Sequence, residues 1–244
     1  MERDLTSGNV FRNVIYFSLP YFLSYFLQTL YGMADLFIVG QFDGVASTTA
    51  VSIGSQVMHM LTVMIVGLAM GATVSIGQSI GAGDKKRASV FVGNTVTLFM
   101  GISLALAVLL LFFVKPIVSV MSTPTEAVSG TVAYLTICFL GIPFITAYNV
   151  ISSIFRGLGD SKSPMYFIAV ACAVNIILDY LFIGFFHLGA SGAALGTTLS
   201  QACSVLFALI AIKRKQTGLS LPYDCFRPNR KKSAWQNSGI LGFR

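Results

Sequence analysis

The sequence predicts an all-α polytopic membrane protein with six transmembrane helices. Hydrophobic residues make up 55% of the 244 residues, charged residues only 10%, and the mean hydropathy is +0.78. Soluble domains carry about a quarter charged residues, so this composition argues against a soluble enzyme. The apolar residues also form six stretches, each reaching the roughly 20 residues that a helix needs to cross a hydrocarbon core.

The first three spans are expected near 13–40, 48–77 and 91–114. The first follows a mixed-charge start and runs directly into further spans, which is not the pattern of a cleavable signal peptide. Pro20 within it removes a backbone hydrogen bond and permits a kink. A GAGD turn at 81–84 separates the second and third spans, and Lys115 ends the third.

The last three spans are expected near 131–156, 164–186 and 192–212. A GLGD turn at 157–160 separates the fourth from the fifth. Neither this turn nor GAGD follows a strand or matches a phosphate-binding loop, so the sequence predicts no enzyme. Gly192 and Gly196 form a GxxxG pair that lets helices approach closely, and packing is the favoured interpretation.

The basic residues predict the orientation of the chain. If the N-terminus is cytoplasmic, 15 of the 16 Lys and Arg residues lie on the cytoplasmic side and only Lys115 lies outside. This follows the positive-inside rule, so both termini are expected in the cytoplasm of a cell-membrane protein. The net charge of +7 therefore needs no nucleic acid to explain it, and the expected contacts are membrane lipids.

The chain divides into a six-helix lobe, 1–212, and a basic segment, 213–244. That segment carries eight of the basic residues and no span-length apolar run. We interpret it as a cytoplasmic linker or a truncated tail.

Two acidic residues, Asp35 and Asp179, fall within the spans, where ionisable groups are costly and indicate function. The helix rise places both, and Thr197 in the sixth span, roughly 8–10 Å below the outer surface. Asn175 lies one turn from Asp179 on the same face. Carboxylate, amide and hydroxyl groups suit a proton or a hard ion such as Na⁺, and no softer metal. The alternative is interhelical hydrogen bonding without transport.

Other polar or aromatic side chains in the spans are candidates for lining a cavity, with packing or lipid contact as the alternative. They are Gln28, Tyr31, Gln56 and Asn149. A lone His59 in the second span is interpreted as a packing residue. No cofactor is expected beyond a coupling ion.

Four segments resemble the multidrug and toxic compound extrusion (MATE) transporters, specifically their N-terminal six-helix lobe. The segments are LPYFLSYFLQTLYGMADLFIVGQF, GQSIGAGDKKRAS, FRGLGDSKSPM and NIILDYLFIGFFHLGASGAALGTTLSQ. This resemblance implies export of cationic amphipathic compounds, small organic cations among them, in exchange for H⁺ or Na⁺. It also implies a cation-coupling site at Asp35, Asn175, Asp179 and Thr197, and a bending point at Pro20.

The resemblance has two departures. Gly32 stands where many relatives have Asn, so the first helix contributes less to the implied site. The family also has twelve helices in two lobes, whereas this sequence contains one, so a second lobe is expected from a missing C-terminal half or a homodimer partner. Two alternatives remain: a lipid-linked oligosaccharide flippase of the same superfamily, and an inactive single-lobe fragment.

Overall fold

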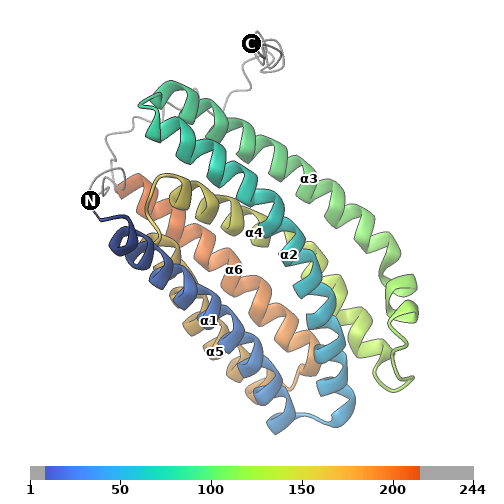
Figure 1. The fold of residues 1–244 in the computed structure, drawn as a ribbon. Helices are drawn as coiled ribbons and strands as arrows, with labels where there is room; N and C mark the ends of the chain where they lie inside the picture. The colour runs from blue at the N-terminus through green and yellow to red at the C-terminus, as the bar shows by residue number, and fades with distance from the viewer. Residues whose placement is uncertain (1–8, 215–244) are drawn as a thin grey trace.

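The computed structural model describes residues 9–214, and within that range it contains helices joined by short turns and no strand (Figure 1). The elements are α1 (Val10–Phe42), α2 (Val45–Gly81), α3 (Lys85–Val120), α4 (Val128–Gly157), α5 (Lys162–Asp179), the π-helix η1 (Tyr180–Phe185) and α6 (Gly189–Arg214). Six segments of this part of the chain are long and apolar enough to cross a membrane. The predicted fold class is confirmed.

Side-chain caps and left-handed glycines explain where several helices begin and end. The Asn9 side chain accepts hydrogen bonds from the first turn of α1, and Asp84 accepts one from the Arg87 amide at 2.9 Å. Asp160 accepts the Lys162 and Ser163 amides at the start of α5. Each GxGD turn places its second glycine, Gly83 or Gly159, at positive φ, which glycine adopts without strain.

The helices pack with α4 and α6 in the interior, α1 and α5 on one flank, and α2 and α3 on the other (Figure 1). Fully buried residues of α4, such as Leu135, Phe139 and Ile142, form the middle of the apolar core. Large apolar side chains such as Phe22 and Phe112 remain exposed on the outer helices, as expected for a surface that faces lipid. The start of α1 and the end of α6 lie at the same end of the bundle.

The helices extend beyond the expected spans at most of their ends, and two of the differences change the interpretation of a residue. The third extends through Pro116 to Val120, so Lys115 is an exposed residue within α3 and does not lie in a loop. The fifth span is not one α-helix, because the backbone changes to a π-helix immediately after Asp179. Apolar length alone does not distinguish these helix types. The predicted segment 213–244 lies outside the described residues, except for Lys213 and Arg214 at the end of α6. Its interpretation as a linker or tail stays a prediction.

Candidate functional site

Two acidic side chains meet inside the bundle. Asp35 lies in α1, and Asp179 is the last residue of α5. Their exposed fractions are 3% and 0%. Their carboxyl groups lie close enough to interact directly. Since α1 and α5 pack side by side, the two residues predicted to share a level do come together.

Thr197 and Asn175 complete this group, which we call the acid site. The Thr197 hydroxyl of α6 donates a hydrogen bond to Asp35 Oδ2 at 3.0 Å. Asn175 is fully buried one turn before Asp179, and its side chain also interacts with Asp35. Three helices therefore bring all four residues predicted for a cation site to one place.

Several atoms of the acid site lack a hydrogen-bond partner among the described residues. They are Asp35 Oδ1, both Asp179 carboxyl oxygens and both polar atoms of the Asn175 amide. A buried polar group without a partner costs about 1–3 kcal/mol, so these atoms are available to a proton, a water molecule or a hard cation. No cluster of three His, Cys, Asp or Glu residues exists between residues 9 and 214, so the group differs from a transition-metal centre.

Gly196 is part of the acid site, and the sequence interpretation missed it. A Cβ atom on Gly196 would contact Asp179 Oδ1 and would come within 3.6 Å of Asn175 Nδ2. Its partner Gly192 instead packs against η1, where a Cβ would lie 3.1 Å from Ile183 Cγ1. The GxxxG pair thus serves close packing at one glycine and makes room for a carboxyl group at the other. Gly196 directly precedes Thr197, a predicted site residue, and this position in the sequence could have indicated that Gly196 belongs to the site.

The π-helix begins where the acid site ends. Asp179 is the residue before η1, and the wider turn is closed by the Phe186 amide bonding to the Leu181 carbonyl oxygen at 3.0 Å. Single π turns occur often at functional sites because they alter the direction of neighbouring side chains. Here the altered turn allows the chain to end a long apolar helix beside a buried carboxyl group.

The other candidates are distributed over α1, α2 and α4. Pro20 lies within a continuous α1, where the Ser24 hydroxyl donates to the Pro20 carbonyl oxygen at 2.8 Å. The Tyr31 hydroxyl accepts a hydrogen bond from Gln201 Nε2 at 3.5 Å. Gln56 and His59 are exposed on α2.

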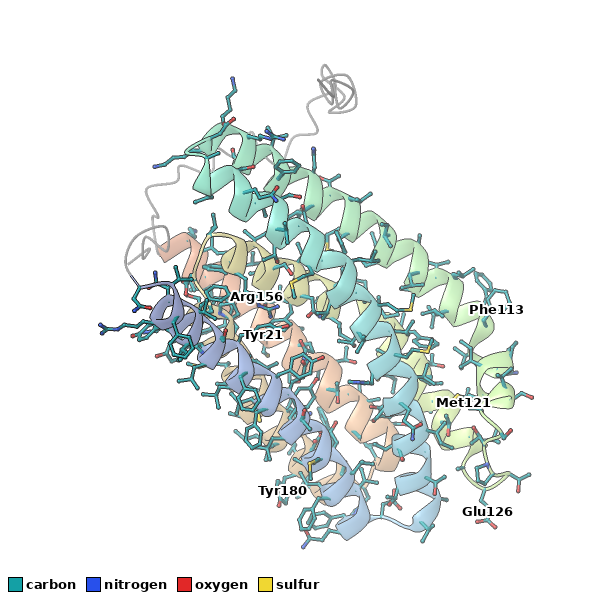
Figure 2. The ribbon with its side chains drawn as sticks, viewed as in Figure 1. Tyr21, Phe113, Met121, Glu126, Arg156 and Tyr180 are labelled. Carbon is teal, nitrogen blue, oxygen red and sulfur yellow. The ribbon has the colours of Figure 1, made fainter. Side chains whose placement is uncertain are left out.

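A second polar site, which we call the basic pocket, lies between α1, α2 and α4. Its lining comprises Tyr21, Ser24, Tyr25, Gln28, Val66, Tyr148, Asn149 and Arg156. Gln28 and Asn149 therefore line a pocket, whereas Tyr31 and Gln56 are not part of its lining. Figure 2 shows Arg156 beside Tyr21, with the guanidinium carbon 4.7 Å from the ring centroid.

Sequence reasoning missed the role of Arg156 as a pocket residue because it counted this side chain only as a topology signal. The residue lies in the last turn of α4 rather than in a loop. It follows Asn149 by seven residues, or about two helical turns, so the two side chains share a face. That spacing could have indicated a shared pocket.

Comparison with known proteins agrees with this architecture. The MatE family profile matches residues 20–181. The chain is 31% identical over 239 residues to the probable multidrug resistance protein YpnP of Bacillus subtilis, covering 98% of this chain and 52% of that protein. It is 29% identical to the multidrug export protein MepA of Staphylococcus aureus, covering 91% and 49%. The chain thus spans about half the length of the curated relatives it matches.

Solved structures show the same half-length match. A MOP superfamily transporter from Pyrococcus furiosus superimposes with a TM-score of 0.83 at 27% identity, covering 91% of this chain and 49% of that one. An outward-facing multidrug resistance MATE transporter gives a TM-score of 0.83 at 28% identity with the same coverage. The six apolar helices, the matched family profile and these relatives lead to one conclusion: the chain is a membrane protein of the MatE family, the multidrug and toxic compound extrusion transporters, and corresponds to one six-helix lobe.

Proposed function

We propose that this chain forms the ion-coupling lobe of an antiporter that exports cationic amphipathic compounds. Multidrug efflux is the activity named for its relatives. In the proposed cycle, H⁺ or Na⁺ enters the acid site as the exported cation leaves. A second six-helix lobe, from a C-terminal half that this sequence lacks or from a second copy of the chain, supplies the facing wall of the passage.

The observation that carries this proposal is the buried pair of interacting carboxyl groups, beside which no cationic side chain lies within residues 9–214. Asp35 bonds to the Thr197 hydroxyl, and the oxygen atoms of Asp179 have no partner among the described residues. Two like charges in a dry environment are unfavourable, so the pair gains most from one small positive ion shared between them. That requirement is the physical basis for coupling.

The coupling ion and the organic cation compete for the negative charge of the two carboxyl groups, and this competition produces the exchange. While the acid site holds its ion, the pair is neutralised and attracts an organic cation weakly. When the ion is released, the restored negative charge favours an organic cation in the adjoining passage. Pro20 provides the bending point in α1, since its missing backbone hydrogen bond lowers the cost of a kink between the two ends of that helix.

The distribution of basic residues supports an orientation with both ends of the chain in the cytoplasm of a cell membrane. Lys85, Lys86 and Arg87 follow the first GxGD turn, and Arg156 and Lys162 flank the second. Both turns lie at the end of the bundle where α1 begins. In that orientation the acid site lies in the extracellular half of the bundle, the side from which a coupling ion would enter.

Transport in proteoliposomes tests the proposal. An imposed H⁺ or Na⁺ gradient should drive export of an organic cation such as ethidium by the purified protein, with its second lobe present. Asp35→Asn and Asp179→Asn should each abolish gradient-driven export, because either change removes one charge of the pair. Glu126→Gln, which alters an exposed acid in the turn before α4, is the matched control and should transport normally.

The result that contradicts the proposal is gradient-driven export that persists in both Asn variants. A mass measurement of the complex in mild detergent establishes which second lobe accompanies the chain. A strict monomer that transports nothing, in a preparation where the chain is folded, would contradict the pairing of this lobe with another copy of itself.

A further inference from the structure

A stripe of polar side chains runs along one face of α1 from the acid site to the basic pocket. Its members follow one another at intervals of three or four residues, which places them on one side of a helix: Tyr21, Ser24, Gln28, Tyr31 and Asp35. All five are buried or half-buried, so this stripe faces the interior of the lobe and not lipid. It therefore connects the acid site with the end of the bundle where α1 begins (Figure 1).

Polar side chains of α6 and α4 accompany the stripe on the facing helices. Gln201 Nε2 donates to the Tyr31 hydroxyl at 3.5 Å. Gln201 is only 3% exposed, and its Oε1 has no hydrogen-bond partner among the described residues. Tyr148 is also buried and lies within electrostatic range of both Tyr31 and Arg156. Polar groups thus continue from the acid site to the guanidinium group of Arg156.

The basic pocket at the end of the stripe has room for about one water molecule. Its volume is about 10 Å³, close to the minimum that a buried water needs, and the amides of Gln28 and Asn149 line it. Hydroxyl groups and water can pass a proton from one oxygen atom to the next. A polar stripe of this kind would let a coupling ion leak through the lobe unless something stops it.

Arg156 places a positive charge at that end of the stripe. Its guanidinium carbon lies 4.7 Å from the centroid of the Tyr21 ring, a distance typical of cation–π contacts. None of the eight residues that line the pocket is acidic. A cation that enters the one-water space therefore meets a like charge that no residue of the lining neutralises, and such repulsion is strong where water is scarce.

We propose that Arg156 is an electrostatic barrier that prevents H⁺ and Na⁺ from passing between the acid site and the end of the lobe where α1 begins. Fixed positive groups exclude protons and other cations from membrane pores by the same repulsion. The inference rests on the proposed function, because an antiporter that lets its coupling ion pass freely loses the gradient that drives export. Tyr21 holds the charge beside the narrow space through which an ion would have to move.

Passive ion leak through proteoliposomes, measured without any substrate, tests the proposal. With the membrane potential clamped by K⁺ and valinomycin, an internal pH dye reports H⁺ leak, and ²²Na⁺ reports Na⁺ leak. The purified protein with its second lobe present should leak both ions slowly. Arg156→Gln should raise both rates by about tenfold, which corresponds to a barrier lowered by about 1.4 kcal/mol. Arg156→Lys keeps the charge and should stay close to the wild type.

Leak of ³⁶Cl⁻ distinguishes a lost charge from a loosened bundle. Arg156→Gln should not raise it, because a positive charge does not repel an anion, whereas disrupted packing would raise the leak of every ion. Arg87→Gln is the matched control. Arg87 also lies over an aromatic ring, with its guanidinium carbon 5.7 Å from the Phe91 centroid, but it is exposed at the start of α3 and is not part of the pocket lining. It should leak like the wild type.

Adding Gln28→Leu to Arg156→Gln tests the route. Leucine replaces the amide that lies between Tyr31 and the pocket, so the cation leak should return toward the wild-type rate. A leak that persists in the double variant would contradict the stripe as the path of the ion. If Arg156→Gln does not fold, Tyr21→Leu provides the same test, because it keeps the arginine and removes the ring that positions it.

Three outcomes would overturn the inference. They are a wild type that already leaks cations rapidly, a cation leak that Arg156→Gln does not change, and a Cl⁻ leak that rises equally with it. Failure of this inference differs from failure of the proposed function. Gradient-driven export with an unchanged leak in Arg156→Gln would contradict the barrier alone, and a wild type that retains its ions but exports nothing would contradict the proposed function alone.

Discussion

The acid site and the basic pocket share helix α1 and differ in charge, burial and access. Asp35 lies 14 residues after Tyr21, so the two sites are separated by about 21 Å along that helix. Figure 2 places Tyr180, which follows Asp179, toward the opposite end of the bundle from Arg156 and Tyr21. The acid site contains no base, and the lining of the basic pocket contains no acid.

This contrast separates a buried acidic group from a partly exposed basic group within a single lobe. Asp35, Asn175 and Asp179 are almost fully buried, as suits a small ion that sheds its water. The basic pocket is lined by half-exposed side chains such as Tyr21 and Gln28 and encloses only about 10 Å³.

The largest expected effect that separates the two sites comes from Gly196→Ala. The added Cβ would contact the Asp179 carboxyl group, so the acid pair can no longer keep its geometry. Ion affinity, measured by ²²Na⁺ binding or by H⁺ uptake, should fall by about tenfold or more, equivalent to about 1.4 kcal/mol. The cation leak measured without substrate should not change.

Gly71→Ala is the control for that substitution, because a Cβ at Gly71 meets nothing within 4 Å. It should bind the ion like the wild type. Normal ion affinity in Gly196→Ala would show that ion binding tolerates displacement of Asp179. That result would contradict the expectation that ion binding depends on the close approach of α6 at Gly196.

An intermediate effect is expected from Thr197→Val. This change removes the hydroxyl that donates to Asp35 Oδ2 at 3.0 Å while keeping the shape of the side chain. This hydrogen bond stabilises the ionised carboxylate, and hydrogen bonds to charged groups contribute about 1.5–3 kcal/mol, so its loss should raise the affinity of the site for H⁺ by about tenfold or somewhat more. Ion titration of the two proteins measures the difference.

Thr97→Val provides the comparison for Thr197→Val. The Thr97 hydroxyl donates only to the Gly93 carbonyl oxygen within α3, away from both sites. Its loss should leave ion affinity and cation leak unaltered. If both threonine variants changed H⁺ affinity equally, the effect would reflect general loosening of the bundle and not the bond to Asp35.

The smallest effect is expected from Tyr21 in the basic pocket. Tyr21→Leu removes the ring that positions Arg156, and cation–π contacts are worth about 0.5–1 kcal/mol at exposed sites, so the cation leak should rise about two- to fivefold. Tyr21→Phe keeps the ring and should leak at close to the wild-type rate. A larger leak in Tyr21→Phe than in Tyr21→Leu would show that the hydroxyl, and not the ring, positions the guanidinium group.

The six helices and the residues of the acid site could be predicted from the sequence alone. Hydropathy predicted the six helices because membrane spans need a fixed apolar length, and the cost of buried charge identified Asp35 and Asp179. Helix rise and direction then placed Thr197 beside them. Apolar length, the positions of charged residues and the helix rise all follow from the order of residues, so one sequence is enough to predict these features.

Other features depend on contacts between helices and could not be read along the chain. Gly196 resembles any packing glycine until its neighbour is known to be a carboxyl group. The π-helix after Asp179 changes the turn without changing hydropathy. Arg156 satisfies the positive-inside rule at any orientation of its side chain, so only the positions of α1 and α4 reveal that it lines a pocket with Tyr21.

Infrared difference spectroscopy of the carboxyl C=O stretch tests most directly whether Asp35 and Asp179 share one exchangeable cation. The spectra would be recorded as pH is raised, with and without Na⁺, on the wild type and on Asp35→Asn, Asp179→Asn and Glu126→Gln. The account predicts a protonated-carboxyl band that titrates in the wild type and in Glu126→Gln and changes or disappears in both other variants. A band that titrates identically in all four proteins, with no response to Na⁺, would contradict it.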